Sequence, residues 1–332
     1  MVNILEPKIL SLITTDKCTA ACHNCCFQCN PKRTKRISLE EMTFILDEVA
    51  RDFPSVISCV FTGGECTILE DDLCRMIRYS KSKGMRNRIV SNGHWAVTET
   101  CALSYLSELK DAGLNELNLS TGDEHQKWVP YERIVYACKA AVKLGLFVAV
   151  NVEATPISRF SSLTMKKDKR LLKEIVSGKI IVKDSLWIEF DKTGSNIDDQ
   201  NVLNDGPCTN LFNTISVSPD LHLQACCGLT CKNSHYLDLG NLRKHSLRRL
   251  YNEQFDDLMK LWLYTHGPKD IYTFLCKEKN EKDESHKYPH LCSLCHHILN
   301  NKENMEIVKD KIDSIIPSVM LKYQFINKIN NK

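Results

Sequence analysis

The sequence predicts an α/β fold, a partial (β/α)6 barrel followed by a cysteine-rich domain. Two observations support this prediction. Between residues 8 and 190, short β-rich segments alternate with amphipathic helical segments, and polar or glycine-containing motifs follow the β-rich segments. After about residue 200 this alternation fades and cysteines become frequent. Repeated βα units imply a parallel sheet with right-handed crossovers, and a TIM-like barrel of this kind has its site at the carboxyl ends of the strands.

Each element is predicted from its local pattern. The first helix is expected to begin at Ser38, because Glu41 stands at the capping-box spacing, and later helices are expected to end at Gly84 and Gly113. The charged residues 277–287 are predicted to form a loop. Six strands are expected at 8–14, 56–61, 88–90, 117–120, 146–152 and 186–190.

The change in residue pattern along the chain predicts three structural parts. Residues 1–200 are expected to form the barrel, and residues 201–300 the cysteine-rich domain. Residues 301–332 are expected to form a helical tail, which is amphipathic and lysine-rich and which we expect to pack on the barrel.

Composition places the chain among ordinary globular proteins. Of its 332 residues, 43% are hydrophobic and 26% are charged, and the net charge of +3 gives no support to a nucleic-acid partner. Two basic runs, 32–36 and 166–170, are predicted to be solvated faces. The amino-terminal residues lack the pattern of a signal peptide and no segment is apolar enough to span a membrane, so we expect a cytoplasmic protein without a membrane partner.

The first cysteine cluster is the most specific motif. Seventeen cysteines without a secretion signal argue against a disulfide framework. Cys18, Cys22 and Cys25 have the spacing C-x3-C-x2-C, and three thiolates can hold three irons of a [4Fe–4S] cube while the fourth iron stays open to a small molecule. A structural zinc site is the alternative, but such sites usually close with four ligands from paired knuckles, and this triplet has no matching local fourth ligand. The spacing and the preceding strand favour iron and sulfur.

Polar motifs follow the predicted strands, where a barrel site would lie. Gly63, Gly64 and Glu65 follow the second strand; glycines let backbone groups approach a ligand, and a carboxylate can pair with an ammonium group. Each polar residue at the other strand ends also has a simpler interpretation as a turn or capping residue. These further candidates are Ser91, Ser120, Asp123 and Asn151.

A second group of cysteines lies in the C-terminal half. Cys292 and Cys295 form a C-x2-C knuckle, and residues 215–220 lead through a predicted hairpin to Cys226. Adjacent side chains on a strand point to opposite faces, so one cube would not take the thiolates of both Cys226 and Cys227. Cys227 is then either an inert thiol or a hydrogen-atom donor to a carbon radical. The whole group is Cys208, Cys226, Cys227, Cys231, Cys276, Cys292 and Cys295.

The cysteine triplet and the strand-end motifs together resemble the radical S-adenosylmethionine (SAM) superfamily. The resemblance implies that Cys18, Cys22 and Cys25 hold a [4Fe–4S] cluster that reduces SAM. One departure is Asn24, because that superfamily often has an aromatic residue before the last cysteine. The residues that would contact SAM, with the first three at its amino group, are Gly63, Gly64, Glu65, Ser91, Ser120, Asp123 and Asn151.

The C-terminal cysteines resemble the twitch domain, a reduced SPASM auxiliary-cluster domain. The glycine that usually follows the hairpin aspartate, here Asp220, is replaced by Leu221. A zinc knuckle is the alternative. The resemblance implies a second [4Fe–4S] cluster on Cys208, Cys226, Cys292 and Cys295.

Over most of the chain the motifs recur in the order found in the radical SAM peptide epimerases of the epipeptide pathway. This resemblance implies that an L-residue of a ribosomally synthesised precursor peptide loses its Cα hydrogen and regains one from Cys227, the catalytic residue, as a D-residue. It also implies an electron donor such as flavodoxin or ferredoxin. The matching segments are 18–31, 61–65, 91–95, 123–125, 226–227 and 292–295.

Two other functions stay open at this point. A radical SAM enzyme that makes a thioether or carbon–carbon cross-link in a peptide would not need Cys227. A non-catalytic iron–sulfur or zinc protein would need neither the Gly63–Gly64–Glu65 turn nor SAM cleavage.

Overall fold

The computed structural model of the protein describes residues 5–155, 157–187, 206–288 and 290–330. These residues belong to two compact units, each described here by itself. One unit contains residues 8–187 and 217–220, and the other contains the remaining residues. The division expected from the sequence, 1–200, 201–300 and 301–332, stays a prediction. No helix in the described part of the chain is both long and apolar enough to cross a bilayer.

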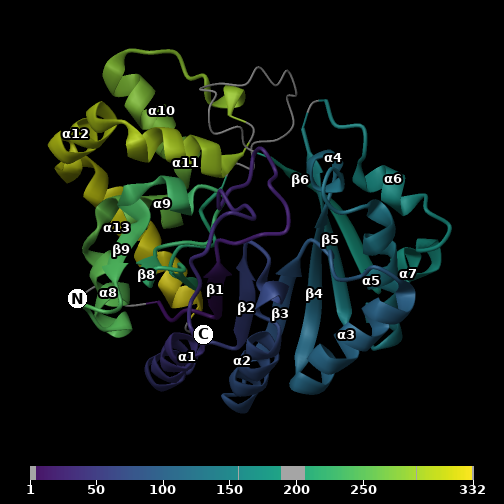
Figure 1. Ribbon diagram of the computed structural model, residues 1–332. Helices are drawn as coiled ribbons and strands as arrows, with labels where there is room; N and C mark the ends of the chain where they lie inside the picture. Colours follow the sequence, from purple (N-terminus) through teal and green to yellow (C-terminus); the bar gives the residue numbers. More distant parts are fainter. Residues whose placement is uncertain (1–4, 156, 188–205, 289, 331–332) are drawn as a thin grey trace. The chain divides into compact units, whose positions relative to one another are not determined.

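The first unit is built on an open sheet of six parallel strands, as predicted (Figure 1). Neighbours in the sequence are neighbours in the sheet, which is the arrangement that repeated right-handed βα units produce. The strands are β1 (Ile9–Thr15), β2 (Ser58–Gly63), β3 (Arg86–Ser91), β4 (Leu114–Thr121), β5 (Phe147–Ala154) and β6 (Ile180–Leu186).

The sixth strand differs from the prediction. It was expected at 186–190, but β6 ends at Leu186, and residues 188–190 lie outside the described residues. In β6, buried Ile180 and Val182 alternate with exposed Ile181 and Lys183, which is the two-residue period of a half-buried strand.

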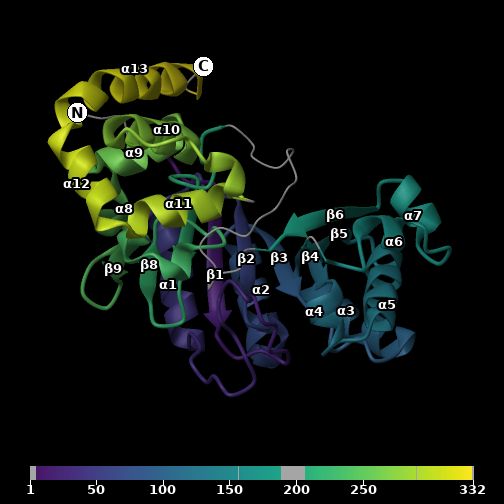
Figure 2. The same ribbon diagram turned by 90° about the horizontal axis from the view of Figure 1, so that it is seen from above.

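Helices follow the strands and lie along one face of the sheet (Figure 2). The first begins as predicted, because the Ser38 hydroxyl accepts a hydrogen bond from the Glu41 N–H and the Glu41 carboxylate accepts one from the Ser38 N–H. Gly113 ends the third helix in the left-handed conformation, with φ +118°. The helices are α1 (Leu39–Asp52), α2 (Asp71–Ser82), α3 (Glu99–Ala112), α4 (Asp123–Gln126), α5 (Tyr131–Lys143), α6 (Ser162–Lys166) and α7 (Leu172–Val176).

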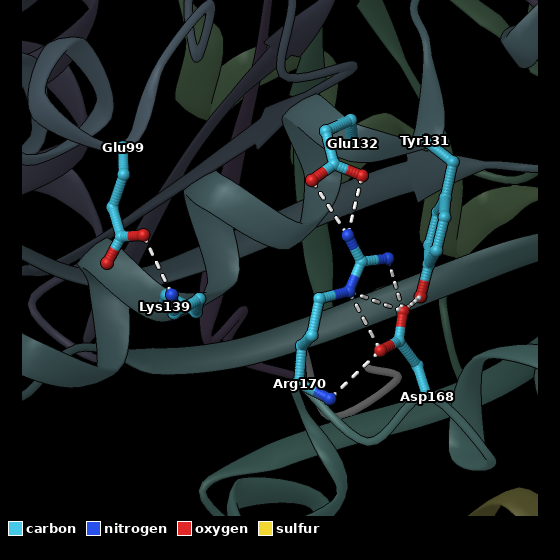
Figure 3. A network of polar contacts seen from close by, with 6 residues as sticks. All are labelled: Glu99, Tyr131, Glu132, Lys139, Asp168 and Arg170. Carbon is cyan, nitrogen blue, oxygen red and sulfur yellow. Dashed lines mark hydrogen bonds and ion pairs between the residues drawn. The ribbon is translucent and has the colours of Figure 1, made fainter.

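An exposed polar network ties the segment between α6 and α7 to α5 (Figure 3). The Arg170 guanidinium pairs with Glu132 at 2.6 Å and with Asp168 at 2.6 Å. The Tyr131 hydroxyl donates to Asp168 at 3.1 Å. Because these groups are partly solvated, the network orients the segment with a modest contribution to stability.

The second unit contains three short strands and six α-helices among its described residues. The turn between its first two strands contains Leu221, whose φ of +63° is left-handed. Leu221 therefore adopts the left-handed backbone conformation that a glycine would adopt with less steric strain. The elements are β7 (Thr214–Val217), β8 (His222–Gln224), β9 (Asp238–Asn241), α8 (Leu247–Glu253), α9 (Leu258–Thr265), α10 (Pro268–Lys279), α11 (Leu291–Asn300), α12 (Lys302–Asp310) and α13 (Ile312–Asn330).

In this unit the C-terminal tail is helical, as expected, and the loop predicted at 277–287 is corrected. The C-terminal tail is two helices that separate at Lys311, and α13 packs on α9, with the Tyr264 and Tyr323 rings 6.3 Å apart. The predicted loop at 277–287 begins only at Asn280, where a left-handed residue ends α10. Lys277 and Lys279, which were expected in the loop, form the last turn of α10, where basic side chains interact favourably with the negative end of the helix dipole.

Candidate functional site

The cysteine triplet lies in the loop that follows β1. A backbone bridge joins Lys17 to Asn30, and the Cys18 N–H donates to the Asn30 carbonyl at 3.2 Å, so the loop closes at its base. The three thiols are near enough to influence one another electrostatically. Cys18, Cys22 and Cys25 thus share one loop within electrostatic range of one another, and their role as cluster ligands stays a prediction.

The three thiols differ in acidity. Burial raises the pKa of Cys18 to about 11 and holds the pKa of Cys22 well above its ordinary value, and the neighbouring cysteines add to both shifts. A hydrogen bond with the Cys29 thiol lowers the pKa of Cys25 to about 6. Cys25 is therefore the readiest thiolate, and the other two would lose their protons as metal binds.

Gly63 and Gly64 lie against the base of this loop. The Gly64 N–H donates to the Thr15 carbonyl at 2.7 Å, and the Glu65 N–H donates to the Lys17 carbonyl at 3.0 Å. A Cβ on Gly64 would stand 2.0 Å from the Lys17 oxygen, and Gly63 has a φ of +124°. The glycines let the end of β2 sit directly beside the residue before Cys18.

The Glu65 carboxylate is fully buried and accepts three hydrogen bonds. Its donors are the Asn92 N–H at 2.7 Å, the Thr67 hydroxyl at 2.8 Å and the Thr67 N–H at 3.3 Å. In the described structure these bonds connect the ends of β2 and β3. Pairing of Glu65 with the SAM amino group stays a prediction.

Asn92 extends this connection to the cysteine loop. Its side-chain amide donates to the Thr19 hydroxyl at 2.9 Å and lies 3.7 Å from the Cys18 sulfur. Its own carbonyl oxygen accepts from the His94 N–H at 3.1 Å. Asn92 directly follows β3, and its bond to Thr19, 73 positions away, had no signal in the sequence.

Two of the predicted SAM contacts are engaged in local structure. The Ser91 hydroxyl accepts from the Gly93 N–H at 3.0 Å and from the Trp95 indole at 2.9 Å. The Asp123 carboxylate accepts from the backbone N–H groups of Arg159 and Phe160. The Ser91 bonds are those of a turn residue, whereas the Asp123 bonds join the start of α4 to the segment that follows β5. Contact of either residue with SAM stays a prediction.

Ser120 and Asn151 are partners in the register between β4 and β5, so they share one face of the sheet. They are half-exposed, whereas the residues on either side of them in each strand are buried. Asn118 shares this face, and its buried Oδ1 has no hydrogen-bond partner among the described residues. An unsatisfied buried acceptor beside two polar groups fits a bound polar ligand.

Polar residues of α4 and of the end of β5, which were not among the predicted site residues, also lie near the cysteine loop. Glu153 of β5 is buried, pairs with His125 Nδ1, and accepts from the Glu124 N–H. Glu124 in turn accepts from the His23 N–H of the cysteine loop at 3.4 Å. A Cβ on Gly122 would lie 2.1 Å from Glu153 Cγ, so glycine is needed there. The sequence signal that could have identified this group is Glu153, an acidic residue within the mostly apolar strand β5.

A cavity of about 230 Å³ lies in the second unit. Its lining contains all four cysteines predicted for the auxiliary site and none of the other three in that group. A Cβ on Gly228 would stand 3.2 Å from the Cys292 sulfur and 3.6 Å from that of Cys226, so this glycine leaves room between two thiols. The four are Cys208, Cys226, Cys292 and Cys295.

Burial dominates the acidity of these cavity thiols. It raises the pKa of Cys208, Cys226 and Cys295, and it raises that of Cys292 to about 11. Within the described residues, no group of three or more histidine, cysteine, aspartate or glutamate side chains is arranged to hold a metal ion. Ligation by either cysteine set therefore stays a prediction.

Cys226 and Cys227 differ in their surroundings. Cys226 is buried and lines the cavity, whereas Cys227 is half-exposed and does not. The pair lies beyond the end of β8 at Gln224, so the alternation of side chains expected along a strand does not apply to it. Cys227 is close enough to Cys231 and Cys292 to raise their pKa values.

Comparisons with known proteins agree with this architecture. Residues 12–157 match the family described as the Radical SAM superfamily. Over 320 residues the chain is 22% identical to a protein of Bacillus subtilis (strain 168) described as "Putative peptide biosynthesis protein YydG", and the match covers 90% of this chain and 94% of that one.

Solved structures give the same result at the level of the fold. "Native anSMEcpe with bound AdoMet" has a TM-score of 0.56 at 14% identity, and the match covers 94% of this chain and 99% of that one. The same protein "with bound AdoMet and Cp18Cys peptide" has a TM-score of 0.55 at 13% identity and equal coverage. These likenesses confirm the predicted partial barrel.

Proposed function

We propose that the protein is a radical SAM peptide epimerase. The proposal starts from the match of residues 12–157 to the Radical SAM superfamily. The enzyme would convert L-residues of a ribosomally synthesised peptide into D-residues. The observation that carries this proposal is the separation of two adjacent thiols, Cys226 in the cysteine-lined cavity and Cys227 outside it. The relative described as a peptide biosynthesis protein supports a peptide substrate.

The residues around the triplet fit a [4Fe–4S] cluster and SAM. Three thiols of unequal acidity lie in one loop, and Gly64 holds the end of β2 at the base of that loop. The orphaned Asn118 Oδ1, beside Ser120 and Asn151, offers an acceptor to a polar ligand. When bound, the reduced cluster and SAM supply a carbon-centred radical that removes a hydrogen atom from substrate.

The cavity residues fit a second cluster. Four thiols line one small space, and Gly228 keeps a side chain out of it. Such a cluster would supply the electron that restores Cys227 after it has given up its hydrogen atom. The four proposed ligands are Cys208, Cys226, Cys292 and Cys295.

The role of Cys227 follows from stereochemistry. Removal of the Cα hydrogen leaves a planar carbon, and a hydrogen atom returned to the opposite face inverts the centre. In this step the S–H bond of Cys227 breaks and a C–H bond forms. The sulfur then takes up one electron and one solvent proton, so the thiol is regenerated. An electron donor such as flavodoxin or ferredoxin would supply the reducing equivalents.

The test compares Cys227→Ala with Cys276→Ala, a substitution of a buried cysteine that does not line the cavity. The reconstituted variants are incubated without oxygen with SAM, a reductant and the peptide encoded beside the gene. We expect Cys227→Ala to cleave SAM but give no D-residue, and Cys276→Ala to behave as the wild type. A Cys227→Ala protein that still modifies the peptide would overturn the epimerase proposal and favour a cross-linking enzyme. Absence of SAM cleavage by the reduced wild type would favour a non-catalytic iron–sulfur protein.

A further inference from the structure

One charged feature of the cysteine loop is not explained by the proposed chemistry. Residues 16–36 contain five lysine and arginine side chains and one acidic side chain, that of Asp16. Residues 31–36 are all exposed, whereas Asp16 is buried. The loop that carries the cysteine triplet therefore presents positive charge to solvent.

The cations of this loop differ in how they are paired. Lys35 pairs with Asp220 at 3.1 Å, and Arg36 pairs with Asp72. Arg33 lies 4.0 Å from Asp16, at the limit of an ion pair. Lys17 and Lys32 are exposed and form no ion pair with any residue that the structure describes. Two ammonium groups are thus available to an acidic partner.

These two lysines lie beside the first cysteine. Lys17 precedes Cys18 directly and forms a backbone bridge with Asn30. The Asn30 carbonyl accepts from the Cys18 N–H, and its side chain accepts from the Lys32 N–H at 2.9 Å. Lys17 is therefore the sequence neighbour of a proposed cluster ligand, and the backbone of Lys32 is linked to that ligand through Asn30.

We propose that Lys17 and Lys32, with Arg33 beside them, form the docking surface for an acidic one-electron carrier protein of the flavodoxin type. The inference rests on the proposed function, because only a redox cluster at Cys18 gives electron transfer a reason to occur there. A one-electron donor must approach the cluster that it reduces, and complementary charge raises the rate of productive encounter. Nearby positive charge that is not already paired suits a carrier rich in carboxylates.

The experiment measures cluster reduction without peptide. Reduced flavodoxin is mixed with the oxidised, cluster-loaded protein in a stopped-flow instrument, and the flavin absorbance reports electron transfer over a range of salt concentrations. We expect Lys17→Gln/Lys32→Gln to lower the second-order rate constant about tenfold at low salt. The difference should vanish at high salt, where exposed charges are screened.

Two controls separate docking from damage to the cluster. Lys167→Gln/Lys169→Gln removes two exposed lysines from the other basic run and should leave the rate unchanged. Dithionite, a small reductant that needs no docking surface, should reduce all three proteins equally. Equal flavodoxin rates for wild type and Lys17→Gln/Lys32→Gln would overturn the docking surface. A wild type that holds no reducible cluster would overturn the proposed function together with it.

Discussion

The Glu65 carboxylate accepts a hydrogen bond from the Asn92 N–H at 2.7 Å, and the Asn92 side chain reaches the cysteine loop at Thr19. The glutamate after the glycine pair, the end of β3 and the first cysteine are thus joined through two buried residues. A substitution at Glu65 should therefore alter the position of Cys18, although the two residues lie 47 positions apart in the sequence.

Glu65→Ala should destabilise the protein by about 1–3 kcal/mol, because it leaves buried N–H groups of Asn92 and Thr67 without an acceptor. Glu65→Gln keeps one acceptor oxygen and should lose less. Urea unfolding followed by circular dichroism measures both free energies of unfolding. Equal losses for the two variants would contradict the role of the carboxylate as a shared acceptor.

Gly64→Ala should displace the base of the cysteine loop, because its Cβ would stand 2.0 Å from the Lys17 oxygen. We expect a loss of about 1–3 kcal/mol in stability and of about half of the bound iron. Gly206→Ala is the matched control, since a Cβ there meets nothing within 4 Å. Iron analysis and thermal unfolding of both variants check this. Full iron content in Gly64→Ala would show that the close approach is dispensable.

The cavity predicts which cysteines hold the second cluster. Alanine at any one of the four cavity cysteines should remove about half of the iron, because the second cluster would then lack one of its four proposed ligands. Cys231→Ala and Cys276→Ala should keep the full iron content, since neither residue lines the cavity. Iron and acid-labile sulfide analysis after anaerobic reconstitution measures this. Iron loss from Cys231→Ala, with retention in Cys208→Ala, would mean that the ligand set is wrong.

The Arg170 network predicts a pH dependence (Figure 3). Hydrogen bonds from Arg170 lower the pKa of Asp168 to about 2, below the value of about 3.9 in an unfolded chain. The resulting stabilisation is complete above about pH 5 and is lost as the pH falls through about 4 to 2. Asp168→Asn should therefore cost about 0.2–1 kcal/mol at pH 7 and only a small part of that at pH 2, where about half of the Asp168 carboxyls are protonated.

Asp111→Asn is the control for this pH series, because Asp111 is exposed and forms no ion pair with a described residue. Urea unfolding between pH 2 and pH 7 gives the stability of each protein. A deficit of Asp168→Asn that stays constant down to pH 2 would contradict the ion-pair explanation.

Local signals in the sequence predicted the fold well. The Ser38–Glu41 capping box and the glycine that ends α3 lie within a few residues of their partners, so the pattern contains the whole interaction. The sixth strand was misplaced by several residues because two apolar runs, 180–186 and 186–190, follow each other closely. The strand order followed from the repeated βα pattern alone.

The site was predictable only in part. Cysteine spacing identified the triplet, whereas the four cavity cysteines were chosen only because of the resemblance to the twitch domain. The pairing of His125 with Glu153 and the reach of Asn92 to Thr19 depend on which strand ends meet in space. No local pattern in the sequence contains that information. For the same reason the bonds between Asp123 and the backbone of Arg159 and Phe160 had no signal in the sequence.

The most direct test of the central claim is the mass of the peptide after reaction in heavy water. The cluster-loaded protein is incubated with SAM, a reductant and the peptide encoded beside the gene. If the Cys227 thiol, which exchanges with solvent, returns the hydrogen atom, each modified residue gains one deuterium and no other mass changes. Loss of two hydrogens from the peptide would contradict the account, because it would mean that a cross-link forms and that Cys227 donates nothing.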